Sequence, residues 1–132
     1  MAPVRPGDGF TDDQRARLAR SLAATESATG LNVVLHVGPL AGGRAGALAL
    51  LASCGEAGDA SVVVAVDPTV RGLEIVTGRR AAVVLSDHTC ALVALAMTSS
   101  FAAGDLVGGI RNGLQVMADH GRNARTVHLD TF

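Results

Sequence analysis

A continuous run of β-branched residues is the feature that most restricts the fold of this chain. Residues 61–66 read Ser-Val-Val-Val-Ala-Val, without the alternation of polar and apolar side chains that is typical of a strand with one solvent-exposed face. Turn residues at 67–72 and a second short run at 73–77 follow, which predicts an antiparallel hairpin over 61–77. The sequence therefore predicts a sheet that is covered on both faces.

The rest of the chain predicts helices and one further strand. Residues 31–37 place apolar side chains at every second position, which is typical of a strand. Thr11 and Gln14 have the spacing of a capping box, and Gly30 is the expected end of that first helix. The segment after Ser86 is apolar almost all round, which predicts a central, buried helix. The expected helices span residues 11–29, 44–54, 87–101 and 105–119.

The order of these elements predicts a single domain of the α/β class. We expect a three-layer sandwich, in which a mixed sheet of about four strands carries helices on both faces. The length of 132 residues suits one domain. Residues 1–9 predict an extended arm and residues 10–121 the domain. Residues 122–132 predict a polar tail, with room for a short edge strand at 126–129.

The composition excludes several classes of function. The chain has three Phe, no Trp and no Tyr, so it has no aromatic platform for single-stranded nucleic acid. All its basic residues are Arg, which excludes lysine chemistry. A net charge of −1 gives no basic footprint for DNA. We therefore expect no nucleic-acid partner.

The location of the chain is read from its apolar runs and its cysteines. The N-terminal residues lack the apolar core of a signal peptide, and the longest apolar run, residues 90–97, is too short to span a membrane. Cys54 and Cys90 share no metal-ligand spacing, and we expect two free thiols. Together these features favour a cytoplasmic protein.

Carboxylates at the starts of segments are the first candidates for a functional site. Several of them at one end of a sheet would bind a hard cation such as Ca²⁺ or Mg²⁺. The alternative is structural, with two of them capping helices and one closing a turn. No dense acidic loop distinguishes the two interpretations. The candidates are Asp8, Asp67, Glu74, Asp87 and Asp105.

Other polar groups offer weaker candidates. Arg79 and Arg80 are candidates for binding an anion, or else a solvated pair. Cys90 lies near a helix start beside His88, but side chains two positions apart on a helix diverge, so we expect it to pack inward. Gly42 and Gly43 precede a helix without a phosphate-binding spacing and predict a turn. No serine-protease-like arrangement is present, and the catalytic residues, if any, are unknown.

The second half of the chain combines Leu85-Ser86-Asp87 at a helix start with Phe101-x-x-Gly104-Asp105 and Gly109-Ile110. This combination resembles the TPM domain, a family that includes thylakoid-lumen phosphatase-like repair proteins, and the resemblance extends over about residues 8–120. The chain is most similar to an uncharacterised, soluble actinobacterial branch, and its Ala, Gly and Arg bias suits a high-GC genome.

The resemblance implies the TPM fold and, through acids in the loops, metal binding and phosphatase activity. Three candidate ligands match the family positions, namely Glu74, Asp87 and Asp105. The chain departs from the family at the loop of residues 77–80, and it has Leu106 where the family has Tyr. Asp105 also has a structural explanation, since a Gly-Asp break between two helices needs a flexible residue and a new N-cap.

From these patterns we expect a small binding or regulatory domain, whose partner is a protein, a divalent cation or both. The alternative is a metal-dependent phosphatase in which an ion held by the carboxylates activates water. A purely structural module is the third hypothesis. We lean towards a non-enzymatic role, with no cofactor beyond a possible Ca²⁺ or Mg²⁺ ion.

Overall fold

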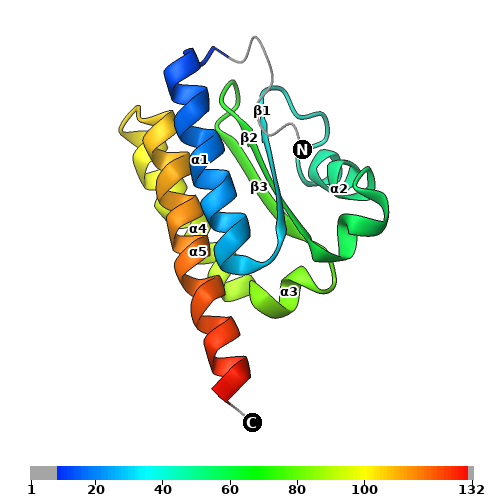
Figure 1. Ribbon diagram of the computed structural model, residues 1–132. Helices are drawn as coiled ribbons and strands as arrows, with labels where there is room; N and C mark the ends of the chain where they lie inside the picture. Colours follow the sequence, from blue (N-terminus) through cyan, green and yellow to red (C-terminus); the bar gives the residue numbers. More distant parts are fainter. Residues whose placement is uncertain (1–8, 131–132) are drawn as a thin grey trace.

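The computed structural model describes the backbone of residues 9–130 and the side chains of residues 9–122. Helices and strands succeed one another along the chain, with a short 3₁₀ helix at Gly55–Ala60 (Figure 1). The elements are α1 (Asp12–Thr29), β1 (Asn32–Val37), α2 (Arg44–Ala52), β2 (Ser61–Asp67), β3 (Gly72–Thr77), α3 (Ala81–Val84), α4 (Asp87–Ala102) and α5 (Leu106–Asp130).

The three strands form one mixed sheet in the order β1-β2-β3. β1 runs parallel to β2, with Val33 opposite Val62, and β2 runs antiparallel to β3, with Val64 opposite Ile75. All seven residues of β2 are buried, as expected for a β-branched strand in the middle of a sheet. The predicted hairpin is confirmed.

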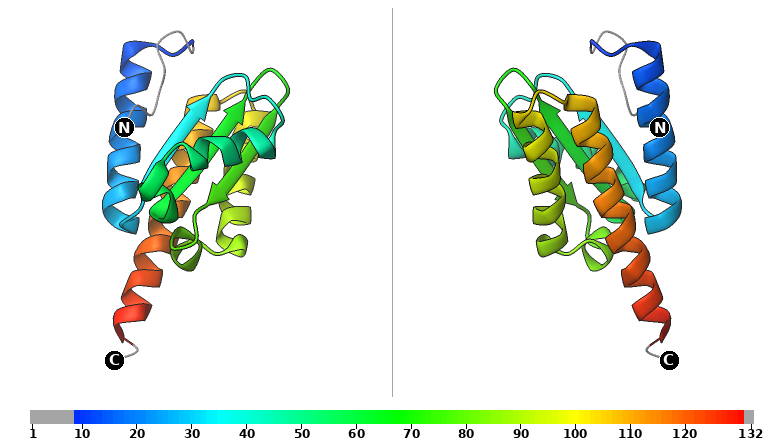
Figure 2. Two further views of the ribbon diagram at one scale, coloured as in Figure 1. Left: turned by 90° about the vertical axis from the view of Figure 1, so that its right-hand side faces the viewer. Right: turned by 90° about the vertical axis from the view of Figure 1, so that its left-hand side faces the viewer.

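Helices lie on both faces of this sheet (Figure 2). α2 packs on one face, where Ala47 contacts a small cluster that includes Val63 and Val76. α1, α4 and α5 pack on the other face around the larger core, which includes Leu18 and Met97. Within this layer α5 lies between α1 and α4.

The first helix begins and ends as predicted. Thr11 accepts a hydrogen bond from the Gln14 amide at 3.1 Å, and the Gln14 side chain accepts one from the Thr11 amide at 2.9 Å. Both ends of the capping box are therefore formed. Gly30 follows the helix with a φ of 73°, a conformation that glycine adopts without strain.

Two expectations about the second half of the chain are wrong. α4 is not central: of its 16 residues only Thr89, Val93 and Met97 are buried, and Leu95 is 63% exposed. The apolar composition of this segment led to the error, because α5 takes the central place and leaves one side of α4 in solvent.

The sheet also has three strands in the described part of the chain, rather than about four. Residues 126–129, where an edge strand was expected within a polar tail, belong to α5, which continues to Asp130. No proline follows position 68 to stop this helix.

Candidate functional site

The candidate acid at the end of β2 is held by the two loops beside it. Asp67 is buried, and its Oδ2 accepts a hydrogen bond from the Leu40 amide at 3.1 Å. Its Oδ1 accepts from the Thr69 amide at 3.1 Å and from the Thr69 hydroxyl at 2.6 Å. The bond from the Thr69 side chain is the main reason why the pKa of Asp67 lies below its ordinary value. This carboxylate closes a turn, as the structural interpretation expected.

Asp105 caps α5. Its Oδ1 accepts a hydrogen bond from the Gly108 amide at 2.9 Å, and its carbonyl accepts the first helical bond from Gly109. At the start of α4 the cap is Ser86, whose hydroxyl accepts from the Thr89 amide at 3.2 Å. Asp87 is the exposed first residue of that helix, where a carboxylate complements the helix dipole.

The candidate metal ligands do not come together. Asp87 begins α4 and Asp105 follows its end, and a helix of 16 residues is about 24 Å long. A shared cation would need oxygens within about 2.6 Å of one point. Glu74 lies on β3 and pairs with Arg44 at 3.9 Å. Asp8 lies outside the described residues. No three His, Cys, Asp or Glu side chains in the described part of the chain gather as metal ligands.

The remaining polar candidates are surface groups. Arg79 pairs with Asp59 at 3.5 Å, with both side chains largely exposed, and Arg80 is exposed. An exposed pair of this kind contributes little to stability. Gly42 and Gly43 have φ values of 79° and 55°, which fits the predicted turn.

Cys90 does not have the surroundings of a reactive thiol. It is partly buried against the larger core. Burial raises the pKa of its thiol, and the negative charge of Asp87 raises it further. The neutral thiol is therefore favoured, which opposes a role as a nucleophile.

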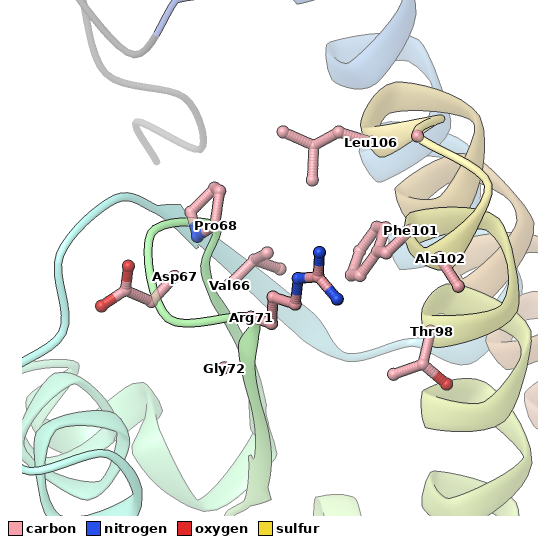
Figure 3. A pocket seen from close by; sticks show the side chains of 10 residues that line it. Val66, Asp67, Pro68, Arg71, Gly72, Thr98, Phe101, Ala102 and Leu106 are labelled. Atoms are coloured by element: carbon pink, nitrogen blue, oxygen red, sulfur yellow. The ribbon is translucent and has the colours of Figure 1, made fainter.

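The structure reveals a pocket that sequence reasoning missed. It has a volume of about 340 Å³ and lies between the β2–β3 turn and the corner where α4 gives way to α5. Figure 3 shows side chains of both regions pointing into the space between them. We call it the turn pocket, and its principal lining residues are Val66, Pro68, Arg71, Phe101, Ala102 and Leu106.

Arg71 is the charged group that faces this pocket. Its guanidinium points towards the ring of Phe101, whereas the carboxylate of Asp67 points away from it (Figure 3). Arg71 has a φ of 53°, and among the described residues it is the one non-glycine with a positive φ. This conformation costs free energy in a residue with a Cβ, and such strain is concentrated at functional sites. Arg71 forms no ion pair within the described residues.

The opposite wall depends on two glycines and on the cap at Asp105. Gly104 breaks the chain between the helices with a φ of 85°. Gly109 allows α5 to approach α4, because a Cβ there would lie 2.6 Å from Cε1 of Phe101. The motif at Phe101, Gly104, Asp105 and Gly109 therefore builds a close helix corner and fixes Phe101 at the pocket.

The fold and the site describe a small α/β domain with an apolar pocket and one arginine beside it. The chain belongs to the family named "Domain of unknown function (DUF5130)", whose model matches residues 4–118. No curated protein matches the sequence. Among the described helices, none combines the length and the apolar character needed to cross a bilayer.

Proposed function

We propose that this domain is a non-enzymatic binding module and that the turn pocket is its ligand site. The observation that carries the proposal is Arg71, a strained residue without an ion pair in the described structure, beside an apolar wall. The pocket volume of about 340 Å³ lies within the range of small-molecule sites. The ligand is an apolar group that carries a carboxylate, on a small molecule or at the end of a peptide.

A cation is a less suitable ligand than an organic anion. Asp67, the acid nearest the pocket, already accepts three hydrogen bonds from Leu40 and Thr69. The separation of Asp87 from Asp105 also argues against the alternative of a metal-dependent phosphatase. Millimolar Ca²⁺ or Mg²⁺ should therefore leave the thermal midpoint unchanged, because a bound ligand raises it. Metal-dependent release of phosphate from a generic ester would contradict the proposal.

We further propose that the chain is related to the TPM domain. Support comes from the element order, in which a helix-strand-helix unit precedes a hairpin, the short helix α3 and two longer helices, and from the Gly104-Asp105 corner. A three-layer arrangement and a cytoplasmic location belong to the same proposal. The two cysteines are free thiols, as is usual in the cytoplasm.

Amide NMR titration of the full chain with sodium hexanoate tests the ligand site, with hexanol and hexylamine as matched probes. We expect hexanoate to shift the amide signals of Gly72, Gly104 and Leu106 most strongly. Arg71→Gln should weaken the binding of hexanoate at least tenfold, since a hydrogen bond to a charged group contributes about 1.5–3 kcal/mol. Arg80→Gln removes the same charge away from the pocket and should have no effect. Equal loss in both variants, or shifts confined to another surface, would refute the proposal.

A further inference from the structure

β3 lies at an edge of the sheet, and its hydrogen-bond register determines which backbone groups point outwards. The Gly78 amide donates to the Ser61 carbonyl at 2.9 Å, just beyond the pair Val62 and Thr77. In an antiparallel ladder, bonded and non-bonded pairs alternate. Glu74 and Val76 therefore bond to β2, whereas the N–H and C=O groups of the odd-numbered residues 73, 75 and 77 point away from the sheet.

These outward backbone groups form no hydrogen bond in the described part of the chain. This holds for the N–H and C=O groups of Leu73, Ile75 and Thr77. The opposite edge is different, because the Val33 amide of β1 donates to the Glu26 carboxylate at 3.0 Å. Natural edge strands are commonly protected by Lys, Pro or a covering side chain, and β3 contains neither Lys nor Pro.

A groove runs along this open edge. It has a volume of about 330 Å³ and is bounded by α2 on one side and α4 on the other. We call it the edge groove, and its two walls include Arg44 and Leu48 of α2 and Asp87 and Ala91 of α4. Leu48 is 45% exposed, which gives the wall of α2 an apolar surface.

We propose that an extended segment of a partner protein adds to β3 in the edge groove and extends the sheet by one strand. Backbone groups would supply the affinity, as in other cases of strand addition. We place the segment antiparallel to β3, which is the commoner strand pairing, so that its first residue lies at the Thr77 end. Arg44 lies beside Glu74 near the start of β3, and Asp87 lines the groove with Thr77 at its end. A segment that begins with a basic residue and ends with an acidic one would therefore match both ends.

The walls of the groove also define the side chains of the partner. Successive residues of an added strand point alternately towards α2 and α4. The α4 wall is formed by the small residues Cys90, Ala91 and Ala94, which leave room for aliphatic side chains at every second position. If a second copy of this chain paired through its own β3, its α2 and α4 would come to the same edge as those of the first copy. We therefore expect a single extended segment of a partner rather than a dimer.

Selection of peptides from a random display library against the full chain tests this proposal. We expect the enriched peptides to share aliphatic residues at every second position, with a basic residue before them and an acidic residue after them. Hydrogen exchange of the Leu73, Ile75 and Thr77 amides should slow at least tenfold when such a peptide is added. Exchange at Glu74 and Val76 should change little, because their amides already bond to β2.

N-methylated peptides supply a control that leaves the protein intact. Methylation at every second residue should abolish binding in one register and be tolerated in the other, because only one set of peptide amides faces β3. Ala91→Trp should fill the groove and weaken binding, and Arg80→Trp should not. The proposal is overturned if no pattern is enriched, if both methylation registers bind equally, or if slow exchange at the edge depends on protein concentration alone. The last outcome would assign the edge to a second copy. Unchanged peptide binding in Arg71→Gln would separate this surface from the turn pocket.

Discussion

Replacement of Gly109 by Ala tests whether the Gly-Asp motif is architectural. A Cβ at this position would lie 2.6 Å from Cε1 and 2.7 Å from Cδ1 of Phe101, and 3.0 Å from the carbonyl oxygen of Met97. The closest contact is about 0.8 Å shorter than the 3.4 Å at which ordinary contacts begin. The ring can rotate, but the carbonyl belongs to the backbone of α4. The two helices must therefore separate.

Two opposing effects set the size of the loss. Ala is a better helix former than Gly by about 1 kcal/mol, whereas an overpacked core costs about 1–3 kcal/mol. Because a backbone atom is involved, we place the cost in the upper part of that range. The expected result is a net decrease of about 1–2 kcal/mol in the free energy of unfolding. In a domain of this size that lowers Tm by about 4–8 °C.

Urea denaturation followed by circular dichroism measures this change, with two comparison variants. Phe101→Leu/Gly109→Ala removes the ring carbons that the new methyl group meets. It should lose at least about 0.5 kcal/mol less than the sum of its single variants. Gly113→Ala would instead meet the side chain of Met97, which is flexible, and should be closer to neutral. A Gly109→Ala protein as stable as the wild type would refute the close-corner explanation of the motif.

Three further substitutions test the roles of single side chains. Asp105→Ala should lower the free energy of unfolding by about 1 kcal/mol in urea, whereas Asp105→Ser should stay within a few tenths, since serine also caps a helix; equal loss in both would contradict the capping role. The pKa of Asp67 is lowered in the folded state, so its contribution to the free energy of unfolding is complete above about pH 4 and is lost as the pH falls through the folded pKa. The urea midpoint of Asp67→Asn should therefore fall less steeply between pH 5 and 2 than that of the wild type. A fall as steep as that of the wild type would refute this assignment. Burial and the charge of Asp87 raise the pKa of the Cys90 thiol. Iodoacetamide should therefore alkylate Cys90 more slowly than it alkylates the thiol of glutathione at pH 8, and Asp87→Asn should speed the alkylation of Cys90. Faster alkylation of the wild type would revive the nucleophile hypothesis.

Local signals in the sequence predicted several elements well. The Thr11 and Gln14 capping box, the turn at Asp67 and the cap at Asp105 all involve residues within three positions of their partners. Both partners of such an interaction lie in one short segment, so a pattern of residue types is enough to predict it. The buried strand was predicted for a similar reason, because the absence of alternation at 61–66 implies cover on both faces.

The candidate metal ligands within the described residues are not brought together, because such a site requires long-range placement. Family-like spacing suggested one site for Asp87 and Asp105, although the length of the helix between them already implied a separation of about 24 Å. The turn pocket was missed because its two walls, at Arg71 and at Phe101, are 30 positions apart in the sequence. The one available signal was a bulky Arg directly before Gly72, at a turn position that needs a left-handed backbone.

The sequence by itself determined the elements, their caps and the sheet hairpin, because these follow from interactions between near neighbours. Only the tertiary structure decided that α5 displaces α4 from the centre, that Arg71 faces Phe101, and that β3 is left as an open edge between α2 and α4. Each of these depends on how segments that are far apart in the sequence pack against one another. No single segment contains that information, because the layers form only when all the elements come together.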